Sequence, residues 1–224
     1  MNTHRILKAF LILTSLLAVA FAPLPVQAAG QTGALPAPAA IAVQSFDEFV
    51  AAVQNGQTGV VRGVYVPGVL ALPVIQQPGN NAAFVSRAQS AVTQFRMAAQ
   101  YGTIGLLAHN YLSGASFGNL AAGHEVRIVY GDSSVRYFMV TKVLRYVALN
   151  PTSPKSDFKD LDSGVTLTAA KLFVQAYQGN HVTFQTCIAK DKNLSWGRLF
   201  VIAVPVADTQ LQNALAENAS VADY

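Results

Sequence analysis

Three polar side chains in this sequence have the chemistry of a covalent catalyst. Cys187 is the single cysteine, so it can form no intrachain disulfide. A thiol that has a partner base or a lowered pKa is a strong nucleophile. His109 follows the apolar run 103–108, where a buried strand would reach the surface, and its imidazole could serve as acid or base. Arg198 begins another apolar run, and its guanidinium could stabilise an oxyanion or hold a substrate carbonyl.

The other histidines are less suited to pair with Cys187. His181 lies six residues earlier on the same predicted strand, which places it about 20 Å away at about 3.3 Å per residue. His124 is expected in an exposed turn. Each of the three candidates also has a purely structural interpretation: a buried inert thiol, a hydrogen-bonded histidine at a strand end, and a solvated arginine.

The elements that would position these side chains are mostly strands. Runs 182–188 and 199–204 predict two strands, with Cys187 and Arg198 at the two ends of the loop 188–197. If these strands pair antiparallel, both side chains reach the same end of the sheet. Further strands are predicted at 103–108, 126–130 and 135–147, shorter ones follow residue 59, and helices are predicted at 83–101 and 167–177. Many short strands with few helices predict a mainly β fold, a closed or nearly closed barrel.

The N-terminal part of the chain predicts export. Arg5 and Lys8 precede the apolar run 9–22 and the small-residue site Val26-Gln27-Ala28, which together are typical of a secretory signal peptide over 1–28. An uncleaved N-terminal anchor is the alternative. Residues 29–44 are rich in Ala and Pro and predict a linker. Ser45 and Glu48 form a capping box that predicts a helix over 45–57. The tail 207–224 is expected to be peripheral.

Composition excludes several classes of function. Hydrophobic residues make up 52% of the 224 residues and charged residues 12%, which is unlike a disordered chain. Of the net charge of +4, Arg5 and Lys8 in the signal segment contribute +2, so the rest carries 4 − 2 = +2, too little to indicate nucleic-acid binding. Cofactors and metals are not expected. The acidic residues 157, 160 and 162 lack EF-hand spacing and are expected in a solvated loop, with calcium as an alternative.

Taken together, these motifs resemble the sortase family. Val182-Thr183-Phe184-Gln185-Thr186-Cys187 is similar to the sortase signature TLxTC, with Phe184 in place of Leu. The segment 196–203, WGRLFVIA, resembles the arginine strand that follows it, and 105–110, GLLAHN, resembles the histidine strand. The resemblance covers residues 58–206, which it identifies as a catalytic domain. The substrate-specificity region, 150–180, matches nothing that can be carried over.

The resemblance implies a cysteine transpeptidase on a closed eight-stranded β-barrel with a few short peripheral helices. Cys187 would attack a sorting signal such as LPxTG and form a thioester, with His109 as acid/base and Arg198 stabilising the oxyanion. Thr186 and Thr183 would orient substrate carbonyls and support the site. An amine of the cell envelope or of a pilin-like protein would then accept the acyl group. The enzyme would be extracellular or associated with the envelope.

Two alternatives to a transpeptidase stay open. On the same fold, water could replace the amine, which would make the protein a thiol hydrolase. A non-catalytic exported protein could instead use the barrel as a peptide-binding scaffold, although a degenerate member of the family would be expected to lose at least one of Cys187, His109 and Arg198. The sequence indicates neither the acyl acceptor nor an oligomeric state.

Overall fold

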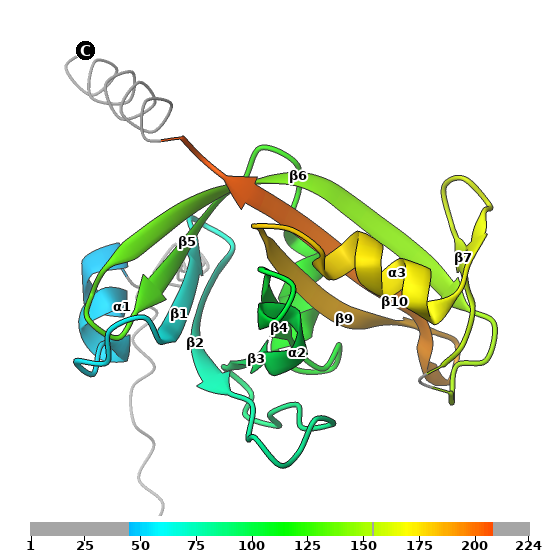
Figure 1. Ribbon diagram of the computed structural model, residues 1–224, viewed down its shortest axis with the longest axis horizontal. Coiled ribbons are helices and arrows are strands. Elements are labelled where there is room, and N and C mark those ends of the chain that lie inside the picture. The colour runs from blue at the N-terminus through cyan, green and yellow to red at the C-terminus, as the bar shows by residue number, and fades with distance from the viewer. Residues whose placement is uncertain (1–44, 154, 208–224) are drawn as a thin grey trace, which may run out of the picture. The chain divides into compact units, whose positions relative to one another are not determined.

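The computed structural model describes residues 45–153 and 155–207, and its framework is a ring of strands (Figure 1). The ring strands are β1 (Val61–Val66), β2 (Leu70–Gln76), β3 (Val92–Phe95), β4 (Ile104–Leu107), β5 (Glu125–Tyr130), β6 (Val135–Ala148), β9 (Val182–Lys190) and β10 (Asn193–Pro205). They are hydrogen-bonded in the order β10-β9-β4-β3-β2-β1-β5-β6, and β6 also pairs with β10. Eight strands of the described chain therefore form a closed barrel, which confirms the fold class predicted from the sequence.

Short elements surround this barrel. Two strands extend the sheet beyond β6, namely β7 (Phe158–Asp160) and β8 (Thr166–Leu167). The helices of the described chain are α1 (Phe46–Val53), α2 (Arg96–Ala99), the 3₁₀ helix η1 (Ser113–Asn119) and α3 (Ala169–Tyr177). None of the helices in this part of the chain is long and apolar enough to cross a membrane.

Strand alternation divides the side chains of β9 and β10 between two faces. Successive side chains of a strand point to opposite sides, so one alternate set fills the barrel interior. Leu106, Phe184 and Val201 belong to that interior core, to which all eight ring strands contribute, and all three are fully buried. The other set, which includes Cys187 and Arg198, therefore lies on the outer face of the barrel.

Helix α3 covers part of this outer face. Leu172, Ala176 and Tyr177 of α3 pack with Tyr146 of β6 and Phe200 of β10 in a second buried cluster. Figure 1 shows α3 in front of β10, and the Thr183 hydroxyl of β9 donates to the Ala176 carbonyl of α3. Aromatic and aliphatic burial of this kind is worth about 1.5 to 3 kcal/mol for each fully buried large side chain. The helix is therefore held against the strands that carry Cys187 and Arg198.

Helix α1 begins at the predicted capping box. The Ser45 hydroxyl accepts from the Glu48 N–H. The Glu48 carboxylate accepts from the Ser45 hydroxyl at 2.8 Å and from the Ser45 N–H at 3.0 Å, and these two hydrogen bonds hold the pKa of Glu48 below its usual value. Phe49 buries the apolar face of the helix against β1 and β5. The predicted signal peptide, the linker 29–44 and almost all of the tail 207–224 lie outside the described residues.

One predicted element is wrong. Residues 83–101 were expected to form a single helix, but only Arg96–Ala99 is helical. The preceding segment Val92–Phe95 is β3, which pairs parallel with β2 and antiparallel with β4. The ring cannot close without a strand at this position, so main-chain pairing with two neighbours outweighs the helical spacing of the sequence.

Candidate active site

Cys187 and Arg198 occupy paired positions on neighbouring strands. Strands β9 and β10 run antiparallel, and their register places Arg198 opposite Cys187 and Leu199 opposite Thr186. Opposite residues of an antiparallel pair project from the same face, with Cβ atoms about 4.5–5.5 Å apart. The predicted antiparallel approach of these residues is thus confirmed. The connection is shorter than expected, because β9 continues to Lys190 and β10 begins at Asn193.

The His109 segment lies along the other side of β9. Strand β4 pairs parallel with β9, and Leu107 is opposite Gln185. Beyond the end of β4, the Ala108 N–H still donates to the Gln185 carbonyl at 3.2 Å. Continued by two residues, the register places His109 beside Cys187 on the outer face. The strand order therefore pairs Cys187 with Arg198 on one side and brings the segment that leads into His109 alongside β9 on the other.

Neighbouring contacts fix the His109 segment. The His109 ring stacks on Tyr111, with ring centroids 5.1 Å apart and an interplanar angle of 20°. Asn110 Nδ2 donates to the Leu194 carbonyl at 2.9 Å, which ties this segment to the start of β10. His109 and Cys187 are both half-buried, so both side chains are accessible to a substrate.

The Arg198 guanidinium is held from one side. Nη1 donates to the carbonyls of Ser195 at 3.0 Å and Gly197 at 2.8 Å, and Cζ lies 5.9 Å from the centre of the Phe158 ring. Within the described residues these hydrogen bonds use Nη1 alone. The remaining N–H groups of the guanidinium are therefore free to donate to an oxygen acceptor.

The two signature threonines are buried and bind main-chain carbonyls of the protein. Thr186, 5% exposed, lies on the inner face of β9, and its hydroxyl donates to the Ala108 carbonyl at 2.9 Å. Thr183, fully buried, donates to the Ala176 carbonyl at 2.6 Å in the last turn of α3. Thr186 thus anchors the His109 segment, and Thr183 anchors α3. This geometry fits the supporting role expected of them, and direct contact with a substrate stays a prediction.

An apolar cavity of about 320 Å³ opens beside this site; we call it the α3 pocket. Its walls come from α3, β3, β7, β9 and β10, and the lining residues are Phe95, Phe158, Ala169, Leu172, Phe173, Tyr177, Gln185, Arg198 and Phe200. Arg198 therefore faces both Cys187 and this cavity. An apolar pocket with a few convergent polar groups is the usual form of a site for a small molecule or a peptide side chain.

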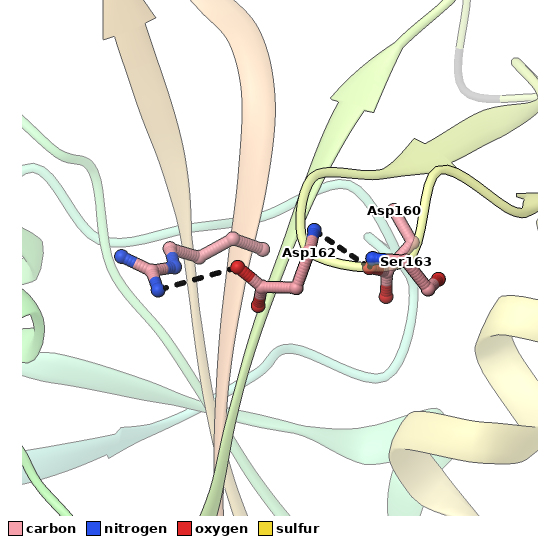
Figure 2. Close-up of polar contacts among 4 residues, drawn as sticks. Asp160, Asp162 and Ser163 are labelled. Atoms are coloured by element: carbon pink, nitrogen blue, oxygen red, sulfur yellow. Dashed lines mark hydrogen bonds and ion pairs between the residues drawn. The ribbon is translucent and has the colours of Figure 1, made fainter.

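The acidic loop lies beside this region. Two main-chain N–H groups donate to the Asp160 carboxylate, from Ser163 at 2.7 Å and from Asp162 at 2.9 Å, and Arg145 lies 3.5 Å from the Asp162 carboxylate (Figure 2). The N–H donors hold the pKa of Asp160 below its usual value. Over residues 45–153 and 155–207, no group of three His, Cys, Asp or Glu side chains is arranged to hold a metal ion.

The remaining histidines are placed elsewhere. His181 is buried at the start of β9, where Nε2 lies 3.0 Å from the Ala176 carbonyl. The Nδ1 of His124 accepts from the Ala121 N–H at 3.3 Å in the turn before β5. Of the described histidines, His109 is thus the one that the strand order brings next to Cys187.

A thiol, an imidazole and a guanidinium at adjacent positions can perform acyl transfer. The imidazole can exchange a proton with the leaving or entering group, and the guanidinium can bind the oxyanion that forms when the thiolate attacks a carbonyl. Sequence reasoning missed Tyr111, which stacks on His109, and Gln185, which lines the α3 pocket. Alternation along β9 could have found Gln185, because residues two apart share a face.

Known proteins resemble this chain in structure but not in sequence. No known family profile matches the chain, and no curated protein sequence matches it. Several solved structures of sortases are similar to this chain. Sortase A of Listeria monocytogenes is 12% identical, with 67% of this chain and 93% of that chain covered and a TM-score of 0.40. A lid mutant of Corynebacterium diphtheriae sortase A is 16% identical, with 66% and 70% covered and a TM-score of 0.42. Sortase C1 of Streptococcus suis is 14% identical, with 72% and 78% covered and a TM-score of 0.43.

Proposed function

We propose that this chain is a sortase-type cysteine transpeptidase that acts on peptide sorting signals at the cell envelope. The observation that carries the proposal is the direct pairing of Cys187 with Arg198, with the His109 segment held on the other side of β9. The proposal is further supported by the α3 pocket, which adjoins Arg198 and offers an apolar surface to a peptide.

The reaction has two acyl-transfer steps. The Cys187 thiolate attacks the main-chain carbonyl of an LPxTG-like signal, and Arg198 binds the oxyanion of the tetrahedral intermediate. When this intermediate collapses, the C–N bond breaks, His109 gives a proton to the leaving amine, and a thioester to Cys187 remains. An amine acceptor then attacks the thioester while His109 takes its proton, which forms a new amide and releases the thiolate.

The supporting residues keep the reacting groups in place. Thr186 holds the main chain immediately before His109, so it is a positioning residue for the acid/base. The acyl acceptor is an amine of the envelope or of a pilin-like protein in this proposal, and the enzyme works outside the cytoplasmic membrane. Neither a metal ion nor a cofactor takes part in these steps.

Acyl-enzyme formation tests the proposal. The full-length protein is incubated with a mixed library of LPxTG-like peptides and amine acceptors, and mass spectrometry follows the mass of the protein and of the peptides. We expect a thioester on Cys187 and ligated peptide. A thioester followed by hydrolysis alone would replace the transpeptidase with a thiol hydrolase, and a Cys187 that forms no adduct would contradict an enzymatic function.

The matched variant is Cys187→Ala. We expect it to lose all turnover, because no other described side chain supplies a nucleophile at this position, while its thermal unfolding stays close to that of the wild type. Peptide ligation at the wild-type rate by this variant would show that the reaction does not go through Cys187.

A further inference from the structure

The glutamine of the signature segment faces the same side of the sheet as the nucleophile. Gln185 precedes Cys187 by two residues on β9, so both side chains project from the outer face. Its neighbours across the strands are Leu107 on β4 and Phe200 on β10. Gln185 is half-buried and lines the α3 pocket. The α3 pocket therefore lies along β9 next to Cys187, on the same outer face of the sheet.

A buried tyrosine fixes the orientation of the Gln185 amide. The Tyr177 hydroxyl donates a hydrogen bond to Gln185 Oε1. Tyr177 is 2% exposed, and burial raises the pKa of its phenol, so the hydroxyl stays a neutral donor. With Oε1 accepting from Tyr177, the opposite side of the amide, which carries the two Nε2 hydrogens, turns away from the phenol.

Tyr177 is itself held by the last turn of α3. The Thr103 hydroxyl donates to the Tyr177 carbonyl at 2.6 Å, and the Thr183 hydroxyl donates to the Ala176 carbonyl at 2.6 Å. The Tyr177 ring also packs edge-on against Phe95 and Phe200. The backbone and the ring of Tyr177 are thus both fixed, so the hydroxyl presents one direction to Gln185.

The polar side chains of the α3 pocket, Gln185 and Arg198, can consequently donate hydrogen bonds to an occupant. Within the described residues, no hydrogen bond occupies Gln185 Nε2, and Arg198 uses Nη1 alone. The rest of the wall is aromatic or aliphatic. An occupant of this pocket must then combine an apolar side chain with a hydrogen-bond acceptor, which is the chemistry of an apolar residue and its main-chain carbonyl.

The spacing of Gln185 and Cys187 matches that of an extended peptide. Two residues of a strand span about 6.6 Å, and carbonyls two residues apart point to the same side of an extended chain. We infer that Gln185, oriented by Tyr177, binds the substrate carbonyl two residues from the one that Cys187 attacks, so that the substrate lies extended along β9. Tyr177 is a positioning residue in this arrangement. The inference rests on the proposed function for the attack at Cys187.

A small probe tests the inference without turnover. The probe is N-acetyl-leucine N-methylamide, which has one apolar side chain and two main-chain carbonyls, and it is added to the full-length, ¹⁵N-labelled Cys187→Ala protein. NMR follows the side-chain NH₂ signals of Gln185, which are assigned by their absence in Gln185→Leu. We expect these signals to shift saturably with the probe. Unmoved signals at saturating probe would overturn the inference.

The variants separate donation from packing. Gln185→Glu keeps an oxygen for Tyr177 but loses both donors, and Tyr177→Phe keeps the ring but loses the orienting hydroxyl. We expect each to weaken binding of the probe about three- to tenfold, which is the range for one net hydrogen bond. In the Gln185→Leu background, Tyr177→Phe should have no further effect, because nothing remains to orient. Gln178→Leu, which changes an exposed glutamine next to Tyr177, is the control and should bind normally.

Two outcomes distinguish this inference from the proposed function. Equal probe binding by wild type, Gln185→Glu and Tyr177→Phe, with a thioester still formed at Cys187, would overturn the role of Gln185 alone. Saturable shifts of the Gln185 signals without any thioester at Cys187 would leave the carbonyl-binding role in place and overturn the transpeptidase.

Discussion

Gly114 lies where helix η1 contacts the segment that carries His109. Replacing Gly114 with alanine tests whether this contact fixes the position of His109. A Cβ atom at this position would overlap Thr186 Oγ1 and come within 2.7 Å of the His109 carbonyl oxygen and 2.9 Å of the Ala108 carbonyl oxygen. Side chains can rotate away from such an overlap, but main-chain carbonyls cannot. The segment that leads into His109 must therefore move.

The size of the effect follows from these contacts. Overpacking of this kind costs about 1 to 3 kcal/mol. At about 2 to 4 °C per kcal/mol for a domain of this size, the midpoint of thermal unfolding of Gly114→Ala should fall by about 2 to 12 °C. A displacement of His109, the proposed acid/base, by about 1 Å can reduce turnover about a hundredfold. Gly114→Ala should thus lose more activity than its loss of stability alone explains.

The same helix provides the matched control. A Cβ atom on Gly118 would meet nothing within 4 Å. Both substitutions remove a glycine from the unfolded chain, which by itself stabilises a protein by about 0.4 to 1 kcal/mol. We therefore compare the two variants in thermal unfolding and in the rate of thioester formation. The difference between them measures the effect of the steric overlap at residue 114.

A double variant identifies which contact matters. Gly114→Ala with Thr186→Ala removes the overlap with the hydroxyl but keeps both carbonyl contacts, and it also loses the Thr186–Ala108 hydrogen bond. Its loss of stability should therefore be smaller than the sum of the losses of the two single variants, and little of the activity should return. Equal unfolding midpoints and equal rates for Gly114→Ala and Gly118→Ala would refute the conclusion that η1 fixes the position of His109.

Three further changes have defined outcomes. Arg198→Lys should slow thioester formation at least tenfold at unchanged stability, because an ammonium lacks the planar set of donors; an unchanged rate would contradict the oxyanion role. Thr168→Ala removes the hydroxyl that accepts from the Lys171 N–H at 3.3 Å, and it should destabilise α3 by about 1 kcal/mol in chemical unfolding, whereas Thr168→Ser should not. The Ser163 and Asp162 N–H groups lower the pKa of Asp160 in the folded protein. The Asp160 carboxylate therefore stabilises the fold at pH values above the pKa of about 3.9 that it has in the unfolded chain. This contribution is lost as the pH falls through the lower pKa of the folded state. Stability of Asp160→Asn should accordingly fall less steeply than that of wild type between about pH 5 and pH 2, and parallel curves would argue against this contribution.

Much of the candidate site could be predicted because it depends on strand alternation and pairing, which leave a pattern in the sequence. Cys187 and Arg198 end and begin two apolar runs separated by a short connection, so antiparallel pairing was sufficient to bring them together. The approach of His109 needed the parallel pairing of β4 with β9, which joins segments far apart in the chain. Only the family resemblance indicated it.

The features that could not be predicted depend on contacts between distant segments. The Tyr177–Gln185 hydrogen bond requires α3 to lie over β9, and nothing in the 167–177 segment specifies where its helix packs. Likewise, the spacing of 83–101 favours a helix, and the partners that make Val92–Phe95 a strand lie outside that segment. Local sequence patterns thus predicted helices and strands correctly where the packing of neighbouring segments favours the same element. They failed at Val92–Phe95, where closure of the ring requires a strand.

Closure of the barrel by β10 affects the order in which the site is completed during synthesis. Strand β10 pairs with both β9 and β6, so the strand that supplies Arg198 also closes the ring. During synthesis from the N-terminus, all other ring strands are complete before residues 193–205 exist. Cys187 is therefore synthesised before Arg198, and a chain that stops before residue 193 lacks both Arg198 and the strand that closes the ring. In the proposed mechanism, activity therefore requires the completed barrel.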